Sequence, residues 1–120
     1  MFCDGSKDAY TVTCFGRFAS KDNKISVNFI FGKSKIAPVN GSLTIPRLEL
    51  VAASMATRVA SIILQECGIK FNQVIYWSDS LATLRLINNT NHHFNVFING
   101  RLSEIHEFRI FLIGSIVQQF

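Results

Sequence analysis

The spacing of apolar and polar side chains predicts strands in the first part of the chain. Residues 9–18 and 25–31 are rich in β-branched and aromatic side chains, which favour strands. The polar stretch 20–24 between them predicts a turn, so the two segments together predict an antiparallel hairpin. Residues 1–5 indicate the end of another strand.

Helical spacing begins after the loop that contains Asn40 and Gly41. Residues 46–66 carry the longest helical pattern, and it starts with a proline, which suits a first helical turn. Gly68 is placed to be the residue that follows the end of the helix. Polar side chains recur along one stripe and predict the solvent face of this helix: Arg47, Ser54, Arg58, Ser61 and Gln65.

The last part of the chain alternates one strand with two helices. A nearly continuous apolar run at 73–78 indicates a buried strand. Residues 80–88 predict a helix with Ser80 as its N-cap, and residues 95–108 predict another. A hairpin followed by a strand–helix unit indicates an α/β layer fold with a mixed sheet.

Composition limits the chain to one domain with a sizeable core, since it has 120 residues and is 48% hydrophobic. The net charge of +4 suits a polyanionic partner or an ordinary solvated surface, because the basic residues are scattered. The chain has no apolar run of about 20 residues, so we expect no membrane span. Three cysteines and no secretory signal predict reduced thiols and an intracellular protein, cytoplasmic or nuclear and not secreted.

Three acidic residues lie in or beside apolar segments, where stability alone rarely places them. They are Asp4 near the start, Glu49 in the first turn of the long helix, and Asp79 after the apolar run. Carboxylates from three separate elements can converge on divalent cations, which is the chemistry of metal-assisted phosphodiester hydrolysis.

Each acid also has a purely structural interpretation. Glu49 shares a helix face with small alanines and is therefore expected to face the sheet, or it only complements the helix macrodipole. Asp79 is either a ligand at the carboxyl end of a strand or a helix N-cap, a role that Ser80 could take instead. Asp4 lies in Asp-Gly-Ser, which is either a turn or part of the site.

Five segments of the chain form an ordered set of motifs. They are Phe2-Cys3-Asp4-Gly5-Ser6-Lys7-Asp8-Ala9-Tyr10, Lys33-Ser34-Lys35-Ile36-Ala37-Pro38, Thr44-Ile45-Pro46-Arg47-Leu48-Glu49-Leu50, Tyr76-Trp77-Ser78-Asp79-Ser80 and Phe97-Ile98-Asn99-Gly100-Arg101-Leu102-Ser103-Glu104-Ile105. In this order they resemble the ribonuclease H-like region of BEL/Pao retrotransposon polyproteins. The last segment matches with Gly100 inserted between asparagine and arginine.

The resemblance implies a ribonuclease H-like three-layer fold, with a mixed β-sheet and flanking helices, that normally follows a reverse transcriptase. It implies cleavage of the RNA strand of an RNA/DNA hybrid with two divalent ions, Mg²⁺ or Mn²⁺. By motif, Asp4, Glu49 and Asp79 match the catalytic, metal-binding acids of the family.

The same resemblance suggests which residues contact the nucleic acid. Gly5 and Ser6 would lie beside the hybrid backbone, where small residues permit close approach. Lys33 and Arg47 are candidate phosphate contacts.

Two departures from the family pattern concern activity. The family has a fourth acid in an Asn-Pro-Ala-Asp-like segment, whereas residues 110–120 form an unrelated apolar tail. Met1 falls just before the Asp4 motif, so we expect residues 1–109 to be a partial domain, truncated at both ends. The alternatives are therefore an impaired nuclease, an inactive remnant that binds nucleic acid or protein, or an unrelated interaction module.

Overall fold

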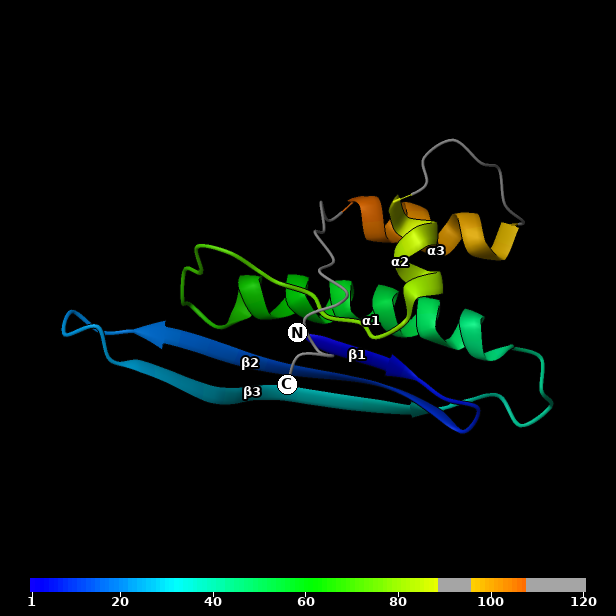
Figure 1. Cartoon of the computed structure of the whole chain (residues 1–120), viewed down its shortest axis with the longest axis horizontal. Helices are drawn as coiled ribbons and strands as arrows, with labels where there is room; N and C mark the ends of the chain where they lie inside the picture. The colour runs from blue at the N-terminus through cyan, green and yellow to red at the C-terminus, as the bar shows by residue number, and fades with distance from the viewer. Residues whose placement is uncertain (89–95, 108–120) are drawn as a thin grey trace.

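The computed structural model describes residues 1–88 and 96–107, which form one small sheet covered by helices (Figure 1). The three strands are hydrogen-bonded in the order β1-β2-β3. Their bounds are Phe2–Gly5 for β1, Ala9–Ala19 for β2 and Ile25–Ile36 for β3. The helices are α1 at Ile45–Glu66, α2 at Leu81–Asn88 and α3 at Val96–Glu107.

The predicted hairpin is confirmed by the antiparallel pairing of β2 with β3. The pairing runs from Ala9 opposite Ile36 to Ala19 opposite Ile25, so β3 extends beyond the predicted end at residue 31. The register shifts between Cys14 and Phe15, where β3 has one extra residue, and such a bulge bends a strand and increases its twist.

The predicted strand at 73–78 is not a strand in the structure, because its only pairing is an isolated parallel bridge with β1. Phe2 and Trp77 form this bridge, the Cys3 N–H donates to the Trp77 carbonyl at 3.0 Å, and the Trp77 N–H donates to the Met1 carbonyl at 2.7 Å. The three-stranded sheet itself is antiparallel, so among the described residues the parallel part of the predicted mixed sheet is limited to this bridge.

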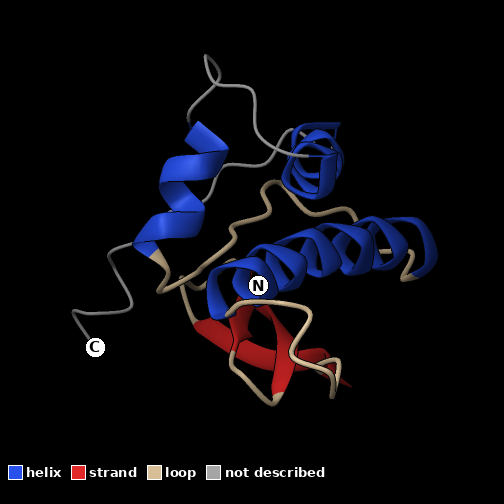
Figure 2. Cartoon of the chain, turned by 90° about the vertical axis from the view of Figure 1, so that its right-hand side faces the viewer, coloured by secondary structure: helices blue, strands red, loops and turns tan. Residues whose placement is uncertain are grey.

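Helix α1 lies between the sheet on one side and helices α2 and α3 on the other (Figures 1 and 2). It begins with proline in its first turn, and Gly68 follows its end with φ +68°, a left-handed conformation that favours glycine. Its apolar residues pack against β1 and β2, and Leu50 and Ala52 have no exposed surface.

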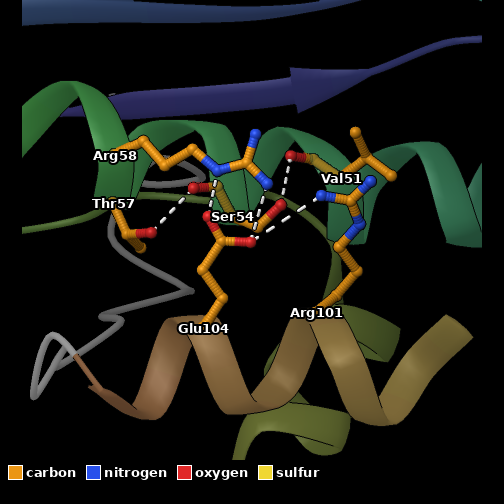
Figure 3. A network of polar contacts seen from close by, with 6 residues as sticks. All are labelled: Val51, Ser54, Thr57, Arg58, Arg101 and Glu104. Atoms are coloured by element: carbon orange, nitrogen blue, oxygen red, sulfur yellow. Dashed lines mark hydrogen bonds and ion pairs between the residues drawn. The ribbon is translucent and has the colours of Figure 1, made fainter. Parts of the chain in front are cut away.

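The polar stripe on α1 is only partly a solvent face, because Arg58 and Gln65 are exposed whereas Ser54 is buried. Ser54 has no exposed surface, because α3 packs along this side of the helix (Figure 3). Arg58 forms a two-pronged ion pair with the carboxylate of Glu104 on α3, with 2.8 Å between Nη2 and Oε2. The Glu104 carboxylate raises the pKa of Arg58. The sequence pattern of one helix does not show whether a second helix packs on its polar side.

Buried hydroxyl groups between α1 and α3 are satisfied by the helix backbone. The Ser54 hydroxyl donates to the Val51 carbonyl at 2.9 Å, and the Thr57 hydroxyl donates to the Ser54 carbonyl at 2.7 Å (Figure 3). Such bonds remove the free-energy cost of burying a polar group without a partner. Polar residues therefore fit inside this layer, although their pattern in the sequence predicts a surface.

By length and composition alone, α1 is long and apolar enough to cross a membrane. The most apolar part of the helix is 61% buried inside the protein, as expected for a core helix. Residues 89–95, between the last two predicted helices, and those of the apolar tail at 110–120 lie outside the described ranges. The division into residues 1–109 and 110–120 therefore stays a prediction.

Candidate active site

Asp4 and Asp79 lie at one end of the parallel pairing between β1 and residues 76–77. Both side chains are exposed, and each follows a residue of the pairing by two positions. Both act on the Cys3 thiol, whose pKa is raised to about 12, mainly by burial. A hydrogen bond with Ser78 lowers that pKa, and the charges of Asp4 and Asp79 raise it. Both aspartates are therefore close to the same buried thiol.

Gly5 brings the end of β1 against the first turns of α1. A Cβ atom at this position would lie 2.6 Å from the backbone nitrogen of Glu49 and 2.7 Å from the carbonyl carbon of Leu48. These distances are shorter than any normal contact, so only glycine permits this approach. The residue after Asp4 is thus fixed directly against Glu49.

The Glu49 side chain connects α1 to the start of α2. The Ser80 hydroxyl donates to Glu49 Oε2 at 2.5 Å and accepts the Thr83 N–H at 3.2 Å, which makes Ser80 the N-cap of α2. The Ser80 N–H in turn donates to the Ser78 hydroxyl at 3.2 Å. The cap is therefore Ser80 and not Asp79, and the half-buried Glu49 faces the protein, as its position among alanines predicts.

The three acids fit divalent cations in donor type, and their elements meet. Carboxylate oxygens are the ligands that Mg²⁺ prefers, and the Gly5 contact together with the Ser80–Glu49 hydrogen bond joins the three segments. Within residues 1–88 and 96–107, however, no three histidine, cysteine or acidic side chains form a group that could hold a metal ion. The structure thus brings the segments together without a finished ligand cluster.

The four predicted nucleic-acid contacts lie in different surroundings. Gly5 is buried, whereas the Ser6 hydroxyl lies in the exposed turn after β1 and donates to the Ala9 carbonyl at 3.1 Å. Lys33 is exposed on β3. Arg47 is half-buried, with its guanidinium carbon 5.4 Å from the centre of the Phe97 ring. Contact with nucleic acid stays a prediction for all four.

Two features near the acids are missing from the sequence-based predictions. The hydrogen bond between Ser80 and Glu49 joins residues 31 positions apart, which no local pattern reveals. The rings of Phe2 and Trp77 stack with centroids 5.9 Å apart, because the parallel bridge places them side by side. The alternation of side chains along a strand could have placed both rings on the face that Asp4 shares.

Comparison with known proteins identifies the family. The family model of the Pao retrotransposon-like RNaseH-like domain matches residues 1–80, two-thirds of the chain. The chain belongs to this family. The match covers the segments that contain Asp4, Glu49 and Asp79 and ends just after the last of them. No curated protein matches the chain.

A solved structure shows the same fold. RNase H1 from the halophilic archaeon Halobacterium salinarum NRC-1 superposes with a TM-score of 0.61 at 13% sequence identity. The alignment covers 98% of this chain and 86% of the archaeal chain. At this identity the likeness shows the fold alone, and it confirms an α/β ribonuclease H-like fold for this member of the Pao family.

Proposed function

We propose that this domain hydrolyses the RNA strand of RNA/DNA hybrids in a reaction that depends on divalent cations. Membership of the Pao RNaseH-like family and the ribonuclease H-like fold support the reaction class. The observation that carries the proposal is the meeting of three elements around Gly5 and Ser80. This meeting places the segments of Asp4, Glu49 and Asp79 at one site.

Mg²⁺ or Mn²⁺, two ions in the proposed active state, would be held by Asp4, Glu49 and Asp79. When bound, the ions would supply positive charge that stabilises the phosphate oxygens during displacement. Glu49 is positioned for this role by the Ser80 hydroxyl, whereas Asp4 and Asp79 are exposed and accessible to a substrate. Ser80 therefore acts as a positioning residue that holds Glu49 toward the start of α2.

The substrate would approach the exposed end of β1. Ser6 lies there in an exposed turn that leaves room for a nucleic-acid backbone, whereas α1 fills the space beside Gly5, so Gly5 would contact a substrate only through its backbone. The 2′-hydroxyl group distinguishes RNA from DNA at such a site. Lys33 and Arg47 are proposed phosphate contacts, and Arg47 would have to share its guanidinium with Phe97. In this proposal the domain works beside a reverse transcriptase in an intracellular compartment.

The test is cleavage of an end-labelled RNA/DNA hybrid by the folded chain in Mg²⁺ or Mn²⁺. We expect cleavage of the RNA strand that is abolished by EDTA and by Asp79→Asn. Asp8→Asn is the matched control, because Asp8 is an exposed aspartate in the turn after β1 and not one of the three proposed ligands. The control variant should cleave like the wild type. Circular dichroism spectra would verify that both variants are folded.

The alternative is an inactive fold that binds nucleic acid or a protein. The lack of a finished metal-ligand cluster in the described part of the chain favours this alternative. If a folded wild-type chain shows no cleavage but binds the hybrid in a gel-shift assay, the alternative is correct. Cleavage that persists in Asp79→Asn at the wild-type rate would refute the assignment of this residue.

A further inference from the structure

Two arginines from different helices lie over one aromatic ring where α1 meets α3. The guanidinium carbon of Arg47, in the first turn of α1, is 5.4 Å from the centre of the Phe97 ring. The guanidinium carbon of Arg101 is 5.5 Å from the same centre, and both Phe97 and Arg101 belong to α3. The negative face of an aromatic ring attracts a cation at such distances. The ring therefore gathers positive charge from two helices.

The nearest carboxylate to Arg101 is shared with a third arginine. Arg101 lies 3.7 Å from the Glu104 carboxylate, but both oxygens of that carboxylate also pair with Arg58 (Figure 3). The side chain of Arg101 keeps 28% of its surface exposed. Glu104 therefore orients Arg101 from one side without being its exclusive partner.

The group as a whole contains more positive than negative charge. Arg47 forms no ion pair among the side chains that the structure describes. Residues 89–95 and 108–120 contain no aspartate or glutamate, so these segments add no carboxylate side chain to the group. Three arginines around one glutamate leave an excess of positive charge, which favours an anionic ligand.

Stacking on a ring leaves the donors of a guanidinium available. A guanidinium that lies over a ring uses its flat face, and its N–H groups point outward in its own plane. These donors match two oxygens of a phosphate group at once. Because the ring also holds the two side chains in place, less conformational freedom is lost when a phosphate binds.

Arg47 connects this group with the candidate active site. Arg47 and Glu49 are two positions apart on α1, which is a rise of about 3 Å along the helix axis. They point to different sides of the helix, because Glu49 meets Ser80 whereas Arg47 meets Phe97. A nucleic-acid strand at the three acids would therefore have the two arginines at the same end of α1.

We propose that Arg47, Phe97 and Arg101 form a subsite for the sugar–phosphate backbone of the RNA/DNA hybrid, away from the cleaved bond. The two arginines bind phosphate groups, and Phe97 is a positioning residue that holds both guanidinium groups. The subsite gives α3 a role in binding, although α3 lies outside the residues 1–80 that the family model matches. The identity of the ligand rests on the proposed function, whereas binding itself requires no cleavage.

The test is binding of a fluorescein-labelled RNA/DNA hybrid of about 12 base pairs, followed by fluorescence anisotropy from about 50 to about 200 mM salt. EDTA is present, so cleavage does not interfere. Arg101→Gln should weaken binding by about tenfold, because a charged hydrogen-bond donor is lost. It should also reduce the slope of log Kd against log salt by about one, as expected for one phosphate contact. Phe97→Leu should weaken binding by about threefold with the wild-type slope, because it removes no charge.

Lys70→Gln is the matched control for the loss of charge. Lys70 is exposed beyond the far end of α1, and a helix of this length spans about 33 Å, so Lys70 is remote from Arg47. This variant should change the affinity by less than about twofold, because distant exposed charges are screened by salt. Circular dichroism and thermal unfolding would verify that the variants are folded. Phe97→Leu leaves the ion pairs of Glu104 intact and tests the subsite even if Arg101→Gln unfolds.

The outcomes separate the subsite from the proposed reaction. Equal affinities of Arg101→Gln and Lys70→Gln, or a wild-type salt slope in Arg101→Gln, would overturn the subsite and leave the nuclease assignment standing. A folded wild-type chain that does not bind the hybrid would also overturn it. The expected binding pattern in a chain that cleaves nothing in Mg²⁺ or Mn²⁺ would support the subsite and refute the reaction.

Discussion

The two edges of the sheet, β1 with its pairing on β2 and β3 on the other side, differ in how deeply their apolar side chains are buried. At the β1 side, Cys3 is 5% exposed and Val12 is 1% exposed, because α1 packs on them. On β3, Val27 and Phe29 are 62% and 63% exposed, and no helix in the described ranges contacts this strand. Both β2 and β3 are rich in β-branched and aromatic residues. Strand propensity therefore does not show which strand belongs to the core.

The comparison indicates where stability and the candidate site coincide. The acids lie at the β1 side, where the helix, the strand and the start of α2 are in direct contact. The β3 side contributes an exposed lysine to the proposed function and little to the core. Changes of the buried residues at the β1 side should therefore affect folding and activity together, whereas changes of the exposed apolar residues on β3 should affect neither strongly.

The largest effect is expected for Gly5→Ala. The added Cβ would overlap the Glu49 backbone nitrogen, so β1 and α1 must separate, and we expect a loss of roughly 3 kcal/mol in unfolding free energy. Urea denaturation measures this loss. Gly100→Ala is the matched control, because nothing lies within 4 Å of its Cβ and alanine should stabilise α3 by about 0.5 kcal/mol. Equal stability of wild type and Gly5→Ala would refute the close contact.

An intermediate effect on stability is expected when a valine is replaced by threonine, a residue of the same shape, once in the buried layer and once on β3. Val12→Thr places a hydroxyl in the buried layer and should cost about 2 kcal/mol. Val27→Thr places the same hydroxyl in water and should change stability by less than about 0.5 kcal/mol. Thermal unfolding of the two variants checks the difference. Similar losses in both would mean that β3 is covered in solution.

The smallest effect should appear as a loss of stability at high pH. Burial raises the pKa of Cys3 from 9.0 to about 12, so the unfolded chain loses this proton first and binds fewer protons above pH 9. Cys3 should therefore have no effect below pH 9, and its titration should lower stability by about 1.4 kcal/mol between pH 9 and pH 10. Denaturation at pH 8 and pH 10 measures the slope.

A pair of cysteine variants would assign that slope. Cys3→Ala should reduce it, whereas Cys67→Ala, at an exposed thiol, should leave it unchanged. Tyr76, whose pKa burial also raises to about 12, adds to the loss above pH 10. A slope that both cysteine variants share would place its origin elsewhere in the protein.

Features that depend on neighbours in the sequence could be predicted. The hairpin, the long helix that Gly68 ends and the Ser80 cap are determined by side chains a few positions apart. The position of Glu49 toward the protein interior followed from the alanines on its helix face. The three acids themselves could be proposed because their residue type conflicts with the apolar segments around them.

Features that depend on distant partners could not be predicted. Ser54 is buried because α3 packs over it, and nothing in α1 itself indicates that helix. The apolar run at 73–78 predicts a strand, but in the structure it forms only an isolated bridge to β1, and pairing of this kind depends on a partner far away in the sequence. The Ser80–Glu49 hydrogen bond could not be predicted for the same reason, because predicting it requires knowing how α1 and α2 lie in space.

The exposure of Asp4 and Asp79 affects the order in which random mutations would remove the acids and Gly5 from a gene copy that is no longer selected for catalysis. Replacing an exposed carboxylate usually changes folding free energy by less than about 0.5 kcal/mol, so either aspartate could be lost while the protein still folds. Gly5 between β1 and α1 does not have this freedom. Random mutation without selection for catalysis should therefore remove the acids well before the glycine, and a copy that retains all of them has kept residues that folding alone does not require.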